Sequence, residues 1–231
     1  MIKEDREFQS DLGIIKKEQM ERATIGDTLI THLNKEFRVI KPNVNDFIEL
    51  MERRCSILVQ KDIGNVLAKT GLGAGCRVVD AGTGAGAIAL NFANVVGEKG
   101  RVFTYEIRED FAEVAQRNID NFGINNIVVK NKDIKEGIDE QQLDLIFLDL
   151  PKPFEIFEDV YKSLRLGGWL VVYAPYIDQA EVAYRIAKKL GFKDLSISEI
   201  LERELEVRPQ GTRPKTRMVG HTGYMVFARK L

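Results

Sequence analysis

The feature that most constrains the fold is an alternation of two kinds of apolar segment between residues 76 and 191. Short apolar runs, which are typical of buried strands, are each followed by a longer segment whose apolar residues recur at helical spacing. Strands that alternate with helices form a parallel sheet with right-handed crossovers, so this region predicts an α/β fold. The expected strands are 77–82, 101–107, 126–131, 143–149 and 167–175, and the expected helices are 86–96, 108–123, 154–164 and 177–191.

The C-terminal part of the chain departs from this alternation. Residues 192–207 and 222–231 both have strand patterns, and no helical pattern lies between them. This predicts an antiparallel hairpin at one edge of the sheet. A parallel sheet that is finished by such a hairpin is the layout of the class I methyltransferase fold, a Rossmann-like architecture.

The N-terminal part, residues 1–45, contains short β-leaning pieces broken by Gly, Asp, Asn and Pro, which indicates a small β module. A helix then begins near Asn43 or Asn45, which are both suitable caps, and a second short helix is expected over 63–69. We therefore divide the chain into an N-terminal β module, 1–45, and a class I methyltransferase catalytic domain, 46–231.

Composition limits the classes of protein to which the chain can belong. Acidic and basic side chains nearly balance, at 35 against 34, which argues against a chain-wide polycation that coats nucleic acid. Cys55 and Cys76 lack metal-ligand spacing and a disulfide-dense setting, so we expect reduced thiols and no metal. The first residues are too charged for a signal peptide, and no apolar run approaches membrane-spanning length. We expect a soluble cytoplasmic protein with no membrane partner.

Glycines lie between the first buried strand and the helix that follows it. They would allow a sharp turn and a close approach of the backbone to a ligand, beside the unpaired N–H groups of the helix start. The candidate cofactor loop is Gly82, Thr83, Gly84, Ala85 and Gly86. Glu106 and Ile107 end the next strand, where a carboxylate can accept both hydroxyls of a ribose. The alternative is an ordinary tight turn.

The spacing of these glycines distinguishes between nucleotide cofactors. It is Gly-x-Gly-x-Gly, whereas the dinucleotide fingerprint requires Gly-x-Gly-x-x-Gly. Asp80, just ahead of the loop, would repel a pyrophosphate but suits a cofactor that carries an ammonium and a sulfonium. These features favour S-adenosylmethionine, with S-adenosylhomocysteine as product, over NAD. Asp133, after the third strand, can accept a hydrogen bond from the adenine amino group, or it can be a solvated loop acid.

Asp149 ends the apolar run 145–148. A bare carboxylate at the end of a buried strand is costly unless the site requires it. Ligands of open parallel sheets bind outside the carboxyl ends of the strands, so we expect Asp149 beside the cofactor loop, as the catalytic residue that touches methyl donor and acceptor. The alternative is a helix N-cap, but Pro151 lacks an N–H that a capping Asp would bind.

Basic side chains gather between the last two expected strands. Arg208, Arg213, Lys215 and Arg217 occur with no acid from residue 208 to His221. A loop at this place would present a basic face beside the active site, where it could bind RNA phosphates. The alternatives are a solvated charged hairpin and, for His221, a structural role.

Four segments together resemble one family. The segments "VVDAGTGAGA", "YEIREDFAEVAQRNI", "LDLPKP" and "TRMVGHTGYMVFARK" are similar to the tRNA (adenine-N1)-methyltransferases, above all the archaeal ones, which modify T-loop adenines 57 and 58. The resemblance implies S-adenosylmethionine as cofactor, tRNA as substrate and a homotetramer. It places the cofactor loop on 82–86, the ribose-binding acid on Glu106, the adenine-contacting acid on Asp133 and the catalytic aspartate on Asp149.

One stretch departs from the family pattern. Where the family typically has a segment like "QIIYPKD", this chain has "SILVQKD", residues 56–62. Lys61 and Asp62 are kept, but Val59 and Gln60 replace the Tyr-Pro pair. The aromatic contact near the methyl donor or target base that the family pattern implies is therefore not expected from this position.

The expected function is transfer of a methyl group from S-adenosylmethionine to N1 of adenine 57, adenine 58 or both in tRNA. Three other interpretations remain at this stage. The first is a methyltransferase acting on a protein isoaspartyl group or a small molecule. The second is a non-catalytic tRNA-binding subunit, in which the cofactor loop should be degraded. The third is a dehydrogenase, which the glycine spacing and the C-terminal hairpin disfavour.

Overall fold

The computed structural model describes residues 7–231, which form two compact units that divide between Met51 and Glu52. The division follows helix α2 (Val44–Leu50), whereas the sequence analysis placed it within this helix, between residues 45 and 46. The helix therefore belongs to the first unit. The first six residues of the expected β module lie outside the described residues.

Two short antiparallel hairpins form most of the first unit. Its elements are β1 (Phe8–Ser10), β2 (Gly13–Ile15), α1 (Lys17–Arg22), β3 (Thr28–Ile30), β4 (Glu36–Arg38) and α2, with β1 paired to β2 and β3 to β4. Thr31 ties the hairpins together, because its buried hydroxyl donates to the carbonyl of Leu12 (2.8 Å) and accepts from the N–H of Lys35 (3.1 Å). Asn43, one of the two expected caps, accepts hydrogen bonds from the first turn of α2.

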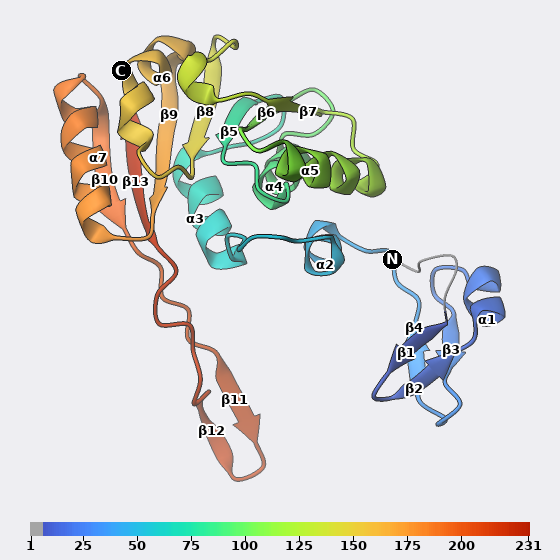
Figure 1. The fold of residues 1–231 in the computed structure, drawn as a ribbon. Coiled ribbons are helices and arrows are strands. Elements are labelled where there is room, and N and C mark those ends of the chain that lie inside the picture. Colours follow the sequence, from blue (N-terminus) through green and yellow to red (C-terminus); the bar gives the residue numbers. More distant parts are fainter. Residues whose placement is uncertain (1–6) are drawn as a thin grey trace. The chain divides into compact units, whose positions relative to one another are not determined.

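A seven-stranded sheet is the centre of the second unit (Figure 1). Its strands are β5 (Arg77–Ala81), β6 (Arg101–Glu106), β7 (Ile127–Asn131), β8 (Leu143–Leu148), β9 (Leu164–Ala174), β10 (Lys193–Ser198) and β13 (Tyr224–Arg229). The order is β10-β13-β9-β8-β5-β6-β7, and only β13 is antiparallel to its neighbours. The predicted antiparallel pair is present as β10 and β13, with β10 at the edge. The strand order reverses at β5, which is where such sheets bind ligands.

Helices cover both faces of this sheet. They are α3 (Gln60–Thr70), α4 (Ala87–Val96), α5 (Glu109–Phe122), α6 (Phe157–Ser163) and α7 (Ile177–Lys189), with 3₁₀ turns η1 (Ile134–Glu136) and η2 (Pro153–Ile156). One apolar core joins the sheet to α3 and α4, and a second joins it to α6 and α7. Leu145 and Phe147 of β8 enter the first core, while Ile146 and Leu148 enter the second, which explains the uninterrupted apolar run. No helix in the described residues is long and apolar enough to cross a membrane.

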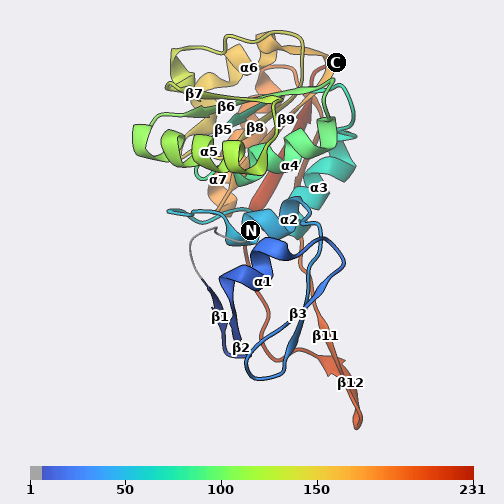
Figure 2. The same ribbon diagram turned by 90° about the vertical axis from the view of Figure 1, so that its right-hand side faces the viewer.

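The segment between β10 and β13 leaves the sheet. The sequence predicted one long strand over 192–207, which is wrong, because β10 ends at Ser198. Beyond it the chain has no neighbouring strand in the sheet, and β11 (Leu205–Arg208) pairs with β12 (Gly211–Pro214) as a separate antiparallel ribbon. We call residues 199–221 the arm. Figures 1 and 2 show its ribbon projecting away from the sheet of the second unit.

Candidate active site

Polar side chains from three neighbouring strands gather at the carboxyl end of the sheet. Asp80 of β5 pairs in register with Thr104 of β6, and Glu106 lies two residues further along β6. Asp149 directly follows β8. Because successive side chains of a strand alternate between faces, all four belong to the face that α3 and α4 cover. The two acids that the sequence analysis assigned to the site, Glu106 and Asp149, therefore lie on one face with Asp80 and Thr104.

The cofactor loop packs directly against the backbone of Asp149. Gly82, Gly84 and Gly86 have φ angles of +91°, +54° and +90°, which residues with a side chain rarely adopt. A Cβ added at Gly82 would lie 2.3 Å from the carbonyl oxygen of Asp149, and one at Gly84 would lie 2.9 Å from the Sγ of Cys55. The predicted loop and the predicted catalytic residue are therefore adjacent.

Glu106 joins the cofactor loop to the start of α5. Its Oε2 accepts a hydrogen bond from the Gly84 N–H (3.0 Å), and its Oε1 accepts one from the Arg108 N–H (3.1 Å). A carboxylate offers about four lone-pair sites, so these two bonds leave acceptor capacity for a ligand. Ile107 beside it is 65% exposed and offers an apolar surface at the same strand end.

Asp80 is fully buried near the loop. Its Oδ2 accepts from the Thr104 hydroxyl (2.7 Å), and the Thr83 hydroxyl shares a 2.6 Å hydrogen bond with Thr104. Within the described residues its Oδ1 has no hydrogen-bond partner. Burial raises the pKa of Asp80 to about 7, against the lowering effect of the Thr104 bond and with the help of the charges of Asp149 and Glu106. A buried carboxylate oxygen without a donor fits a ligand that brings a positive charge or an N–H group.

The carboxylate of Asp149 is available to a ligand. Burial alone raises its pKa to about 6, and none of the described side chains or backbone groups donates a hydrogen bond to it. The residue that precedes η2 is Lys152, and no side chain caps this turn. The helix-cap alternative for Asp149 is therefore excluded, while Pro153 begins η2 as a proline at a helix start should.

Tyr173 is a site residue that the sequence analysis missed. It lies near the end of β9, one residue past the partner of Leu148, and is therefore next to Asp149. Its hydroxyl donates to the carbonyl of Thr222. Burial raises the pKa of Tyr173 to about 12, and the charges of Asp62 and Asp149 add to the shift. The signal that could have found it is the same as for Asp149, a polar side chain at the carboxyl end of a central strand.

Asp133 follows β7 as expected, but it has a local structural role. Its Oδ1 accepts a hydrogen bond from the Lys135 N–H (2.9 Å), so it caps η1. This bond engages one of the two carboxylate oxygens of Asp133 in the local turn.

Three of the basic side chains of the arm are paired with acidic ones. Glu206 of β11 contacts Arg208 (2.5 Å) and Arg213 (3.7 Å), and Glu204 forms an ion pair with Lys215. Both acids precede the stretch 208–221, in which the sequence has none, and the pairing of β11 with β12 brings Glu206 opposite Arg213. The arm is therefore less basic than the sequence of its second half indicates.

His221 fastens the base of the arm to the sheet. Its Nδ1 lies 2.6 Å from Oε1 of Glu199, and its Nε2 lies 2.9 Å from the carbonyl oxygen of Pro175. Two acceptors favour a ring with a proton on both nitrogens, and the pKa of His221 is raised, chiefly by the Glu199 bond. The structural role that the sequence analysis kept as the alternative for His221 fits this geometry.

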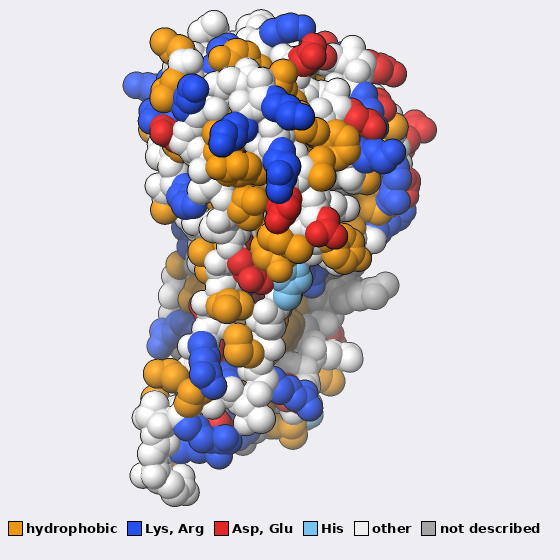
Figure 3. Space-filling model, turned by 90° about the vertical axis from the view of Figure 1, so that its left-hand side faces the viewer, with side chains coloured by type: hydrophobic (Ala, Val, Ile, Leu, Met, Phe, Trp, Pro, Cys, Tyr) orange, Lys and Arg blue, Asp and Glu red, His pale blue; other side chains and the backbone are white. Residues whose placement is uncertain are grey.

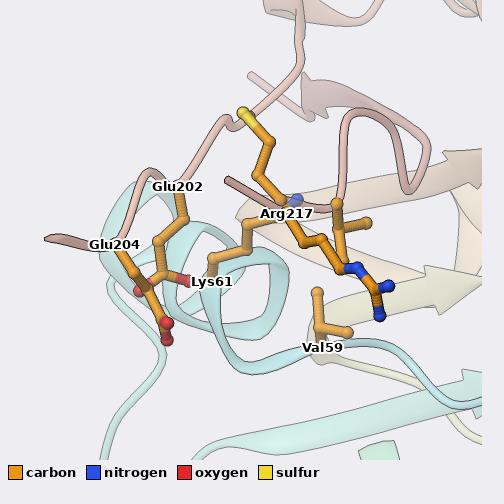
Figure 4. Close-up of a pocket in the computed structure, with 7 residues that line it drawn as sticks. Val59, Lys61, Glu202, Glu204 and Arg217 are labelled. Atoms are coloured by element: carbon orange, nitrogen blue, oxygen red, sulfur yellow. The ribbon is translucent and has the colours of Figure 1, made fainter. Parts of the chain in front are cut away.

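A cavity of about 410 Å³ lies between the start of α3 and the arm. It is lined by Val59, Lys61, Glu202, Glu204, Arg217, Met218 and Val219. Figure 4 shows the two glutamates on one side of Lys61 and Arg217 on the other. Val59, where the family pattern has Tyr, lines this cavity, and Gln60 is the first residue of α3, a position where Pro is also well accepted. The Tyr-Pro replacement thus changes the wall of a cavity and preserves the helix start.

A second basic surface lies on α7, which the sequence analysis did not single out. A depression of about 750 Å³ is lined by Glu181, Tyr184, Arg185, Lys188, Lys189 and Ile197. Figure 3 shows Lys and Arg side chains spread among apolar ones over this side of the second unit. Unlike Lys215 of the arm, Lys188 and Lys189 have no acidic partner among the described residues.

The fold and the site define the class of protein. The sheet has an antiparallel strand inserted next to its edge, a glycine loop after β5 and an acid at the end of β6. This is the class I, Rossmann-like, S-adenosylmethionine-dependent methyltransferase fold. Across residues 7–231 no group of three or more His, Cys, Asp or Glu side chains is placed to hold a metal ion.

Comparison with known proteins narrows this class to a family. The sequence model of the family described as "tRNA methyltransferase complex GCD14 subunit" matches residues 38–213. An archaeal relative, the tRNA (adenine(57)-N(1)/adenine(58)-N(1))-methyltransferase TrmI of Methanocaldococcus jannaschii, is 37% identical over 96% of this chain and 87% of its own length. The chain therefore belongs to the GCD14/TrmI family of tRNA methyltransferases.

Two solved structures share the fold over nearly the whole chain. A SAM-dependent O-methyltransferase from Thermotoga maritima has a TM-score of 0.91 and 32% identity, over 99% of this chain and 86% of its own. The tRNA (m1A58) methyltransferase TrmI from Aquifex aeolicus has a TM-score of 0.83 and 28% identity, over 98% and 89%. The names of these two proteins differ in the acceptor atom.

Proposed function

We propose that this protein transfers a methyl group from S-adenosylmethionine to N1 of adenine 57, adenine 58 or both in the T-loop of tRNA. The observation that carries the proposal is Asp149, an unpaired and largely buried carboxylate whose backbone packs against Gly82 of the cofactor loop. The names of the relatives from Methanocaldococcus jannaschii and Aquifex aeolicus support the choice of acceptor.

The cofactor would be held by residues at the ends of β5 and β6. When bound, S-adenosylmethionine supplies the methyl group that is transferred. The loop 82–86 would approach it with its backbone, Glu106 would accept from the ribose hydroxyls, and the unpaired Oδ1 of Asp80 suits its positive charge. Ile107 and Asp133 would contact the adenine ring and its amino group. No metal is part of this proposal.

Asp149 would orient the acceptor base. The N1 atom of adenine has its own lone pair, so the ring needs no covalent activation by the protein. The ionised carboxylate would accept a hydrogen bond from the N6 amino group and offset the positive charge that develops on the methylated ring. A pKa of about 6 leaves Asp149 mostly ionised at neutral pH, as this role requires.

The arm would contact the RNA backbone. The N1 edge of the target adenine is hidden in folded tRNA, so the nucleotide must leave its stack, and basic side chains must hold the neighbouring phosphates. Arg208, Arg213, Lys215 and Arg217 are assigned this role. The ion pairs of Arg208, Arg213 and Lys215 with Glu204 and Glu206 are exposed and weak, so phosphates can replace the carboxylates at small cost. His221 would support the arm and lie close to the RNA.

The family resemblance further implies a homotetramer in the cytoplasm. The arm supports self-association, because it exposes a series of large apolar side chains, which in soluble proteins mark an interaction surface. These are Leu201, Leu205, Val207, Met218 and Val219. Light scattering on the purified protein measures the assembly directly, and a monomer at micromolar concentration would contradict it.

The proposed function is tested by incubating the protein with labelled S-adenosylmethionine and an unmodified tRNA transcript. Stops of reverse transcription at position 57 or 58 are expected, since methylation of N1 blocks base pairing. Label on protein, or a label-free tRNA, contradicts the proposal. Because one structural relative is named as an O-methyltransferase, the same reaction is run with a small-molecule extract, and label on a small molecule alone favours that acceptor class.

A further inference from the structure

A buried ion pair lies at the start of α3, where a segment remote in the sequence packs against it. Lys61 and Asp62 are neighbours, and their side chains are only 8% and 2% exposed. The Nζ of Lys61 lies 2.8 Å from Oδ1 of Asp62. A buried pair of charges is stable only when further hydrogen bonds satisfy the remaining polar atoms.

Thr222, from the segment that leads into β13, supplies these bonds. Its hydroxyl donates to Oδ2 of Asp62 (2.7 Å) and accepts from Nζ of Lys61 (2.6 Å). The three side chains thus form a closed ring across a sequence separation of 160 residues. We call Lys61, Asp62 and Thr222 the clamp.

The clamp acts on the backbone that holds Tyr173. The carbonyl of Thr222 accepts the hydrogen bond of the Tyr173 hydroxyl. The next residue, Gly223, lies against the tyrosine ring, because an added Cβ would come within 2.4 Å of its Cζ. Tyr173 in turn lies next to Asp149 at the carboxyl end of the sheet. A continuous set of contacts therefore joins the clamp to Tyr173, whose hydroxyl lies close enough to the proposed catalytic carboxylate for that charge to act on it.

We propose that the clamp is a positioning device that holds the Tyr173 ring beside Asp149 as one wall of the acceptor-base site. The inference rests on the proposed function. Because the hydroxyl of Tyr173 is bound to a main-chain carbonyl, the ring face, and not the phenolic proton, is what this residue offers to an acceptor. The clamp would then set the rate of transfer to the base without taking part in cofactor binding.

The choice of variant matters because the clamp contains buried charges. Asp62→Asn would leave Lys61 buried and uncompensated, and such a protein can fail to fold. Thr222→Val keeps the shape and the ion pair but removes the hydroxyl that links them to the β13 segment. Thr222→Ser restores the hydroxyl. Thr28→Val makes the same change at an exposed position of strand β3 in the first unit, outside the proposed cofactor and RNA sites, and serves as the matched control.

The expected result is a loss of turnover without a loss of cofactor affinity. Thr222→Val should lower kcat for tRNA methylation by about tenfold, as expected for removal of hydrogen bonds to charged groups, with the Kd for S-adenosylmethionine unchanged. Thr222→Ser should recover most of the rate, and Thr28→Val should match the wild type. All rates are measured at a temperature well below the Tm of every variant.

A double-mutant cycle with Tyr173→Phe separates positioning from general stabilisation. If the clamp acts through Tyr173, the two changes share one effect, and the double variant should lose about tenfold rather than about a hundredfold. Additive losses, or a normal kcat for Thr222→Val, would overturn the proposal. If the wild-type protein methylates no tRNA, that result contradicts the proposed function, and this inference, which rests on it, fails with it.

Discussion

At the scale of single residues, the chemistry of the site comes from two carboxylates in different surroundings. Asp149 is raised to a pKa of about 6 by burial alone, and Asp80 to about 7 by deeper burial together with the charges of its neighbours. Burial disfavours the charged form of an acid, so each carboxylate is ionised at an energetic cost. A bound cation, or a nucleobase that donates a hydrogen bond, can offset this cost.

The first prediction concerns Asp149. Its ionised form is needed to accept a hydrogen bond from the acceptor, so kcat should fall as the pH drops below about 6. Asp149→Asn should lower kcat by about 100- to 1,000-fold, because it removes the charge at the reacting centre. Its Kd for S-adenosylmethionine, measured by calorimetry, should stay close to that of the wild type. Near-normal methylation by this variant would contradict the assignment of Asp149 as the catalytic residue.

The second prediction concerns Asp80. Its pKa in the folded protein, about 7, lies above the ordinary value of 3.8. Because burial favours the neutral carboxyl, the stability that this form contributes is fully present below about pH 4 and is lost as the pH rises through about 7. In the ligand-free protein, the free energy of unfolding should therefore decline from pH 5 to pH 8.

The affinity for a cationic ligand should increase with pH, whereas the free energy of unfolding should decrease. Deprotonated Asp80 attracts positive charge, so the affinity for S-adenosylmethionine should rise between pH 6 and pH 8. Asp80→Asn should flatten this rise and reduce the decline in stability to the part that Asp149 contributes through its own raised pKa, as measured by calorimetry and urea unfolding across the same pH range. A variant with the wild-type pH dependence would show that another group is responsible.

At the scale of elements, the site depends on how closely β5 and β8 approach each other at their carboxyl ends. Gly82 makes this approach possible, since no side chain fits between its Cα and the carbonyl of Asp149. Gly84 is crowded in the same way, because a Cβ added there would lie against the side chain of Cys55. The loop is therefore shaped by its neighbours as much as by its own backbone angles.

The third prediction compares two glycines with similar backbone angles. Gly82 (φ +91°) is crowded, whereas Gly75 (φ +86°) has open space around it. Gly75→Ala should cost about 1 kcal/mol of unfolding free energy and leave cofactor affinity unchanged, because only backbone strain is added. Gly82→Ala should cost more and abolish detectable cofactor binding, because Asp149 must also move. Equal effects in urea unfolding and calorimetry would contradict this account of the loop.

At the scale of the whole molecule, the arm is separable from the sheet. Its ribbon makes its own ladder, and the backbone N–H of Lys215 donates to the carbonyl of Glu204 (2.9 Å) at the base of that ladder. Residues 205–214 can therefore be replaced by a two-residue Asn-Gly turn that closes on the same pair. The clamp and His221 lie outside the replaced segment.

The fourth prediction uses this shortened arm. The variant should bind S-adenosylmethionine with wild-type affinity, because the site on β5, β6 and β8 is untouched. Its affinity for tRNA should fall by about tenfold or more, with a weaker dependence on salt, because phosphate contacts are lost. Filter binding at several salt concentrations measures both quantities. An unchanged tRNA affinity would show that tRNA binds another surface, and the basic face of α7 would then be tested next.

The sequence by itself determined the features that depend on local pattern. The apolar periods predicted the parallel strands and their helices, and the antiparallel pair at the edge followed from the missing helix between the last two strand patterns. The rule that ligands bind at the carboxyl ends of parallel strands brought Glu106 and Asp149 to one place, because topology alone sets where strand ends lie.

Only the tertiary structure decided the contacts between remote segments. The expected strand 192–207 stops at Ser198 because its partner β13 begins near Met225 and offers no further backbone to pair with. The contact of Glu206 with Arg213 depends on the register of β11 with β12. Thr222 meets Asp62 across 160 residues. Such contacts arise from the packing of elements against each other, and a side chain's local sequence carries no information about which distant partner satisfies its charge or hydrogen bonds.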